Sequence, residues 1–163
     1  MTAEPVPDVD GDLVVLVQAC SAVLGDATLE RVRDDVGPDV RFHDGYVFQH
    51  LLVGPCTVSE LARRLGITQQ AASKHVADLV ARDLVTKHRS PGDGRAWQVE
   101  LSARGRRAVD AARRARAALL ADCEDALGSD AMEQLLGQLR ELSDHLGALD
   151  VMMARRLKPE PAR

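Results

Sequence analysis

The chain has 163 residues, of which 45% are hydrophobic and 28% charged, and its formal net charge at pH 7 is −4. This composition is typical of a folded protein with one compact domain or two lobes that share a core, and it excludes a disordered tail. The first residues are acidic and include prolines, and no apolar run approaches the roughly 20 residues that span a bilayer. We therefore expect a cytoplasmic protein with no membrane segment.

The net charge conceals three parts of alternating sign. Residues 1–56 contain 10 acidic and 3 basic side chains. Residues 57–116 contain 6 acidic and 13 basic side chains, and residues 117–163 contain 9 acidic and 5 basic ones. A polyanion would meet the basic middle part, and DNA or RNA is the commonest partner of this kind. A solvated, charged surface is the alternative interpretation.

The three cysteines are Cys20, Cys56 and Cys123, and they lie far apart without CxxC or Cys/His spacing. This pattern predicts neither a disulfide framework nor a zinc site. We interpret all three as small apolar core residues in a reducing compartment, and we expect no cofactor and no metal.

Apolar residues recur at helical spacing from Leu13 to Leu24 and predict a long first helix near 10–33, with Gly37 and Pro38 ending it. A second helix is predicted near 44–53, before the breaker pair Gly54-Pro55.

A helix-turn-helix is predicted next. Thr57 stands three residues before Glu60, which is the spacing of a capping box at a helix start. Gly66 supplies the positive φ that ends this helix, and Thr68 can cap a second helix that runs to about Arg82. Two short helices joined by a glycine turn form this motif.

The second of these helices has a buried and an exposed face. Ala72, Val76 and Leu79 lie at i, i+4 and i+7 and are predicted to face the core. The opposite face carries Gln69, Gln70, Ser73, Lys74 and Ala77. Gln can bond adenine, Lys can bond guanine and Ser can bond either type of group, so this face is suited to a DNA major groove.

After Leu84 the apolar period changes to two, and the segments "LVTKHR", "SPGDG" and "RAWQVEL" predict a β-hairpin. Its tip carries Asp93 and Arg95, where the arginine can enter a minor groove and the aspartate can orient the guanidinium. Trp97, Val99 and Leu101 are predicted on one face. Further basic residues have the charge to hold phosphates: Arg63, Arg64, Lys87, Arg89 and Arg104.

Two long helices follow, the first capped at Ser102. The last contains a heptad seam with spacings of three and four: Met132, Leu135, Leu139, Leu142, Leu146, Leu149 and Met153. Such a seam indicates pairing with a second chain, although packing on its own chain is the alternative. The elements together predict a mainly α fold with a small β-hairpin wing, that is, a winged helix-turn-helix plus a helical dimerisation lobe.

The stretch from "TVSELARRLG" to "LSARG", residues 57–105, resembles the winged helix-turn-helix core of the MarR family of bacterial transcription regulators. The flanking helices are similar in order. The resemblance implies an N-terminal dimerisation helix in residues 1–43, a DNA-binding domain in 44–104 and C-terminal dimerisation helices in 105–163. It further implies a homodimeric repressor that binds double-stranded DNA at a palindromic operator, with Ser73 and Lys74 at recognition-helix positions and Asp93 and Arg95 at the wing tip. Together with the residue chemistry above, the predicted DNA contacts are Thr68, Gln69, Gln70, Ser73, Lys74, Arg89, Asp93 and Arg95.

Three positions depart from the family pattern. Asp83 replaces a helix-ending glycine, which aspartate tolerates better than most residues because it visits the left-handed region. Gly94 replaces a second wing arginine. His75 stands at a usually apolar position, and we interpret it as a core histidine bonded to a neighbour.

The resemblance also implies a small-molecule effector, bound between the lobes, with His43, Tyr46 and His50 as candidate polar lining. Packing or surface roles are the alternative for these three. Peroxide-sensing members of the family use a cysteine near the start of the first helix together with tyrosines. Cys20 lies about one turn past that position and Tyr46 is the sole tyrosine, so a redox-sensing regulator is the weaker alternative.

An enzyme is not expected. Ser143, Asp144 and His145 are triad residue types, but adjacent residues on a helix point in different directions. The sequence has no Gly-rich phosphate loop and no nucleophile elbow. A winged-helix module that docks on another protein is the better rival, and salt-dependent DNA binding would distinguish the two.

Overall fold

The computed structural model describes residues 11–89, 97–148 and 151–152. Its elements, in chain order, are α1 (Leu13–Val36), α2 (Asp44–Leu51), β1 (Cys56–Thr57), α3 (Val58–Leu65), α4 (Gln69–Ala81), β2 (Val85–Arg89), β3 (Trp97–Leu101), α5 (Ala103–Leu127) and α6 (Ser129–Leu146). The predicted mainly α fold with a β wing is confirmed.

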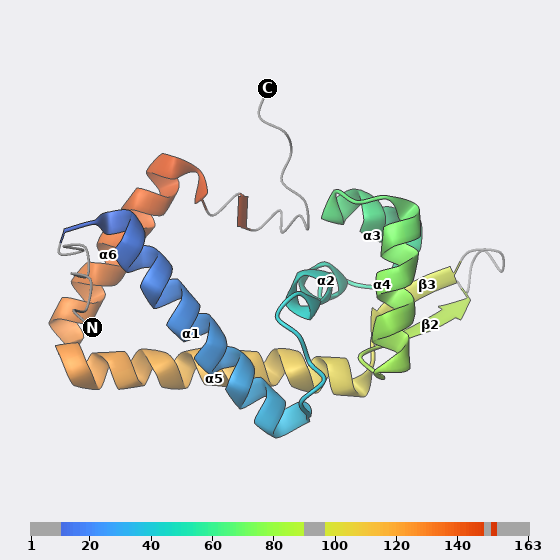
Figure 1. Cartoon of the computed structure of the whole chain (residues 1–163), viewed down its shortest axis with the longest axis horizontal. Helices are drawn as coiled ribbons and strands as arrows, with labels where there is room; N and C mark the ends of the chain where they lie inside the picture. Colours follow the sequence, from blue (N-terminus) through green and yellow to red (C-terminus); the bar gives the residue numbers. More distant parts are fainter. Residues whose placement is uncertain (1–10, 90–96, 149–150, 153–163) are drawn as a thin grey trace, which may run out of the picture.

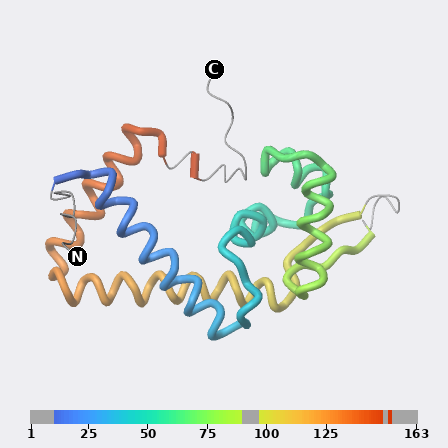
Figure 2. The backbone as a smooth tube through the Cα atoms, viewed as in Figure 1, coloured from blue at the N-terminus to red at the C-terminus, as the bar shows by residue number. Residues whose placement is uncertain are grey.

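The elements form two lobes (Figure 1). The winged lobe contains α2, α3, α4 and the sheet. In the other lobe, α1, α5 and α6 form an open triangle, in which α5 runs along the base and continues into the winged lobe (Figure 1, Figure 2). We call this second part the helical lobe.

The first two helices differ in length from their predictions. Helix α1 begins after Asp12, whose carboxylate accepts hydrogen bonds from the Val14 and Val15 amides at 3.0 and 3.1 Å. It continues one turn beyond the predicted end, because Gly37 still donates its amide to the Arg33 carbonyl at 2.8 Å. Helix α2 ends at Leu51, two residues earlier than predicted.

The predicted helix-turn-helix is confirmed in its local detail. The Glu60 amide donates to the Thr57 hydroxyl at 3.2 Å, and the Thr57 amide donates to the Glu60 carboxylate at 2.8 Å. Gly66 ends α3 with φ +66°. The Thr68 hydroxyl accepts from the Ala71 amide at 3.2 Å and so caps α4.

The sheet is antiparallel, with the strand order β1-β3-β2. The hairpin of β2 and β3 was predicted, whereas the short β1, in which Cys56 pairs with Val99, was not. Val99 and Leu101 are buried as predicted. Trp97 is 44% exposed, so the buried face of β3 ends at Val99.

Helix α5 joins the two lobes at a close backbone contact. Ser102 caps the helix by accepting from the Gly105 amide at 2.9 Å, and its hydroxyl donates to the Asp83 carbonyl at 2.6 Å. A Cβ atom at Gly105 would lie only 2.0 Å from the Leu84 carbonyl oxygen. Glycine is therefore needed for α5 to enter the core.

The N-terminal half of α1 packs little against its own chain. Large apolar side chains on this half are exposed, and Val23 has 68% of its surface accessible. By length and composition α1 could cross a membrane, so the expectation that no apolar run approaches this length is wrong for this helix. The same composition suits a helix covered by a second protein chain.

The core interpretation of the cysteines holds in part. Cys56 is buried, and burial raises the pKa of its thiol. Cys123 is half-buried. Cys20 is exposed, so its assignment to the core of this chain is wrong, because that part of α1 contacts little of its own chain.

Candidate nucleic-acid interface

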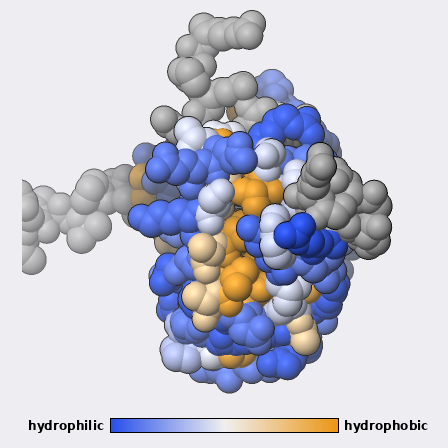
Figure 3. Space-filling model, turned by 90° about the vertical axis from the view of Figure 1, so that its right-hand side faces the viewer, coloured by the Kyte–Doolittle hydropathy of each residue, from blue (hydrophilic) through white to orange (hydrophobic). Residues whose placement is uncertain are grey.

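Helix α4 lies in the winged lobe, away from the helical lobe (Figure 1). One of its faces is polar and exposed. Ala72, Val76 and Leu79 are buried, as predicted from their spacing. The predicted exposure of the opposite face is also confirmed: Thr68, Gln69, Gln70, Ser73 and Lys74 are all exposed. Figure 3 looks onto this end of the molecule, where hydrophilic side chains surround a narrow apolar strip.

The N-terminal turn of α4 is suited to an anionic partner. Its free backbone amides and the helix dipole give this end a partial positive charge. No acidic side chain lies in the first turn to neutralise it. Because the Thr68 oxygen accepts the cap hydrogen bond, this residue fixes the turn while its hydroxyl proton stays available for donation.

The wing carries a cluster of two cations on one aromatic ring. Lys87 Nζ lies 5.1 Å and Arg89 Cζ lies 5.2 Å from the centroid of the Trp97 ring. Cation–π attraction at these distances holds both groups on the outer part of the hairpin. The sequence analysis placed Trp97 on one face with Val99 and Leu101 but did not identify this cluster. Alternation along the paired strands puts Lys87 and Arg89 on the same face as Trp97. The predicted tip residues Asp93 and Arg95 lie outside the described residues.

An ion-pair network holds the other end of α4. Arg82 donates to both Asp44 oxygens at 2.6 and 2.9 Å, to Asp78 at 2.6 Å and to the Asp39 carbonyl at 2.9 Å. The hydrogen bonds to Asp44, together with those to Asp78, raise the pKa of Arg82 further above its usual range. This network joins α4 to the segment between α1 and α2. No local sequence signal predicts it, because Asp44 and Arg82 are far apart in the chain.

Arg104 is part of the same network, so its predicted phosphate contact is wrong. Its guanidinium donates to Asp39, to the Val36 carbonyl and to the Arg82 carbonyl. The hydrogen bond from Arg104 lowers the pKa of Asp39. Arg64 also has a partner within the chain, because its guanidinium donates a hydrogen bond to the His50 carbonyl at 3.2 Å. The side chains of Lys87 and Arg89 are exposed on the wing.

Comparison with known proteins identifies the winged lobe. Residues 39–96 match the sequence model of the MarR family. This match indicates a winged helix of the MarR type in residues 39–96. No curated protein sequence matches the chain.

Solved structures share the fold of most of the chain. RV1404 of Mycobacterium tuberculosis is 21% identical, with 88% of this chain and 97% of that chain covered and a TM-score of 0.71. YusO of Bacillus subtilis is 20% identical, with 86% of this chain and 99% of YusO covered and a TM-score of 0.68. MepR of S. aureus, in a complex with DNA, is 18% identical, with 82% of this chain and 97% of MepR covered and a TM-score of 0.65. These likenesses show a MarR-type winged-helix fold.

Two departures from the MarR pattern have different outcomes. Asp83 adopts a φ of +53°, so it takes the left-handed conformation expected where the family has glycine. His75 is exposed, so its interpretation as a core histidine is wrong. It lies at the margin of the stripe formed by Ala72, Val76 and Leu79, where a helix meets solvent.

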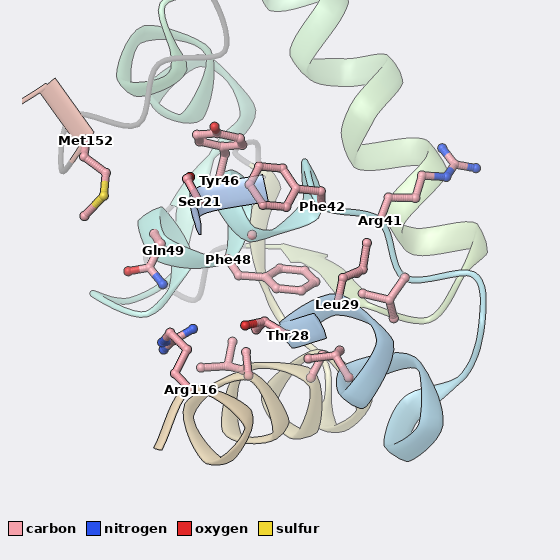
Figure 4. Close-up of a pocket in the computed structure, with 16 residues that line it drawn as sticks. Ser21, Thr28, Leu29, Arg41, Phe42, Tyr46, Phe48, Gln49, Arg116 and Met152 are labelled. Carbon is pink, nitrogen blue, oxygen red and sulfur yellow. The ribbon is translucent and has the colours of Figure 1, made fainter. Parts of the chain in front are cut away.

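A cavity of about 410 Å³ lies between α1, α2 and α5, where the MarR segment meets the helical lobe (Figure 4). Of the three candidate ligand residues, Tyr46 lines this cavity and makes an edge contact with Phe42 at 6.1 Å between ring centroids. His43 and His50 are not among its lining residues. In the described residues, no group of three His, Cys, Asp or Glu side chains is placed to hold a metal.

Proposed function

We propose that the protein is a sequence-specific DNA-binding transcription regulator that acts as a homodimeric repressor at a palindromic operator. The exposed face of α4 carries this proposal. It combines a free helix N-terminus with donor side chains on a helix whose other face is buried. Such a helix fits the major groove, where its first turns reach base edges.

The proposed contacts divide into two kinds. Gln69, Gln70, Ser73 and Lys74 read base edges, while Lys87 and Arg89 hold phosphates beside the groove. Thr68 fixes the start of the helix. Asp93 and Arg95 lie outside the described residues and are proposed as further DNA contacts. The corresponding division of the chain is a dimerisation helix in 1–43, a DNA-binding domain in 44–104 and dimerisation helices in 105–163.

The proposed dimer rests on exposed apolar side chains of α1 and α6, two helices of the helical lobe (Figure 1). They include Leu13, Val14, Leu16, Val17, Val23, Leu135, Leu139 and Leu146. Large apolar side chains that are exposed on two helices of one lobe mark an interaction site, and a second copy of the chain would cover them symmetrically.

Sedimentation velocity tests the dimer. We expect the wild-type chain to sediment as a dimer and Val23→Asp to sediment as a monomer, because a charge would then be buried at the interface. Val53→Asp is the matched control, since Val53 is 85% exposed on the winged lobe. A wild-type monomer at tens of micromolar concentration would contradict the proposed dimer.

A small-molecule effector is proposed to release the DNA through the cavity between the lobes. Arg41 lines this cavity and donates to Asp78 of α4 at 3.2 Å. A ligand in the cavity would therefore act on a side chain that is bonded to the recognition helix.

A gel shift tests the DNA-binding proposal directly. Duplexes that flank the protein's own gene are incubated with the full chain at two salt concentrations, with nonspecific competitor present. We expect a discrete complex that resists the competitor and weakens as salt rises, because phosphate contacts release counterions. The absence of a complex at low salt would contradict the proposal and favour a protein-docking module.

A further inference from the structure

Lys87, Arg89 and Trp97 lie on one face of the hairpin formed by β2 and β3. The register pairs Arg89 with Trp97 and Lys87 with Val99, and side chains at paired positions point to the same side of a sheet. Val99 is buried in the core that includes residues of α3 and α4. Towards the tip the same face leaves the core, because the other three side chains are exposed. The cluster therefore stands on the side of the wing that faces the helix-turn-helix, and the hairpin lies beside α4 (Figure 1).

The opposite face of the hairpin has a different balance of charge. Glu100 lies there, with its carboxylate 3.6 Å from Nδ1 of His88 and 3.7 Å from a guanidinium nitrogen of Arg106. Of the hairpin residues that the structure describes, none on the face of Lys87 is acidic. A polyanion would therefore meet less repulsion on the face that carries the cluster.

The Trp97 ring holds a cation without neutralising it. Elsewhere in the winged lobe an arginine is held by acids, as where Arg82 is paired with Asp44, whose carboxylate offsets the positive charge. Lys87 Nζ instead lies 5.1 Å from the centroid of the Trp97 ring, and within the described parts of the chain it forms no ion pair. An aromatic ring attracts a cation through its quadrupole and carries no net charge. The lysine side chain is thus ordered while its charge stays available to a partner.

We propose that Trp97 is a positioning residue for DNA binding, which holds Lys87 and Arg89 ready to contact the phosphate backbone beside the groove that α4 enters. This inference rests on the proposed regulator function, because it assigns a further residue to the same interface. A basic side chain that is already held on a ring loses less rotamer freedom when it meets a phosphate. Because phosphates carry no sequence information, Trp97 contributes affinity and not selectivity.

Substitution of the ring tests the contribution to affinity. We expect Trp97→Leu to bind a labelled duplex at least about threefold more weakly than the wild type at low salt. The loss should be the same for a duplex that flanks the protein's own gene and for a random duplex of equal length. Trp97→Phe retains a ring and should recover most of the loss. Thr86→Ala is the matched control, since Thr86 is exposed on the opposite face of β2 and should leave the affinity unchanged.

A double-mutant cycle distinguishes a positioning role from a merely structural one. If the ring acts through Lys87, then Lys87→Ala should weaken DNA binding less in the Trp97→Leu protein than in the wild type. Fluorescence anisotropy measures the four affinities, and far-UV circular dichroism verifies that each variant is folded. Additive losses, or equal affinities of a folded Trp97→Leu protein and the wild type, would overturn the inference.

The wild-type protein provides a second measurement that needs no substitution. Trp97 is the sole tryptophan of the chain, so the intrinsic tryptophan fluorescence reports on this ring alone. We expect bound DNA to lower the quenching of this fluorescence by acrylamide, because the duplex covers the cluster. A DNA complex in which acrylamide quenches the ring as strongly as in the unbound protein would overturn this inference and leave the regulator proposal standing. The absence of any DNA complex at low salt would overturn both.

Discussion

Arg82 and Asp44 form a bidentate ion pair that joins the last turn of α4 to the first turn of α2, with N–O distances of 2.6 and 2.9 Å. Their side chains are only 10% and 7% exposed. Asp44 also accepts a hydrogen bond from the Arg41 amide at 2.8 Å. The recognition helix is therefore held at its C-terminal end by the segment that leaves α1, while its N-terminal end is free to meet a partner.

Asp44→Ala is expected to destabilise the fold by about 3–5 kcal/mol, because it leaves the Arg82 charge buried with only part of its bonding. Urea unfolding followed by circular dichroism, at fixed protein concentration, measures this loss. Asp110→Ala is the control, since Asp110 pairs with Arg113 on the surface and should cost no more than about 1 kcal/mol. Equal losses in the two variants would contradict the structural role of the buried pair.

Gly105→Ala is expected to cost at least about 2 kcal/mol, because the new methyl group would overlap the Leu84 carbonyl oxygen and force the backbone of α5 to move. Gly45→Ala is the matched control, since no atom lies within 4 Å of a Cβ built there. In that helix, alanine should be neutral or stabilise by up to about 1 kcal/mol. The same denaturation experiment compares the two, and a fully stable Gly105→Ala protein would refute the close approach.

The features that sequence predicted well depend on neighbouring residues. The Thr57 capping box, the glycine end of α3 and the Thr68 cap all arise from contacts within a few positions, so local spacing is sufficient. The left-handed Asp83 was instead inferred from the family resemblance, which has glycine at this position. The two faces of α4 follow in the same way from helical periodicity.

The features that sequence missed depend on residues that are distant along the chain. The short β1 forms only because β3 supplies a partner for Cys56. Arg104 was assigned to phosphate, yet Asp39 and two carbonyl groups bind it in the fold. The apolar cavity is lined by α1, α2, α5 and the segment between α1 and α2, so no single segment indicates it.

Acid is expected to weaken the network around α4. Hydrogen bonds from Arg104 and Arg82 lower the pKa values of Asp39 and Asp78 below 3.8. A carboxylate whose pKa is lower in the folded state than in the unfolded state stabilises the fold at pH values above its unfolded-state pKa. This contribution is lost as the pH falls through the folded-state pKa. The free energy of unfolding should therefore drop below about pH 4, and the drop should be smaller in an Asp39→Asn, Asp78→Asn double variant. Parallel acid profiles of the two proteins would contradict this account.

Two lysines are expected to differ in how their loss affects DNA binding. Lys87→Ala should weaken binding to all sequences alike and reduce the slope of log affinity against log salt by about 0.9, as for one lost phosphate contact. Lys74→Ala should cost about 1–3 kcal/mol and relax selectivity at one base pair in each half-site. Fluorescence anisotropy on operator variants at several salt concentrations distinguishes these patterns. A uniform loss for Lys74→Ala would reassign it to a phosphate.

Selection from a pool of random DNA duplexes tests the central claim most directly, because it assumes no operator. The full-length protein should enrich a two-fold symmetric sequence whose half-sites lie about 10 base pairs apart, the spacing at which two recognition helices meet successive major grooves. A Gln70→Ala, Lys74→Ala double variant should lose the bases that these residues read. Failure of the wild-type protein to enrich any sequence at low salt would contradict the proposal that α4 reads DNA.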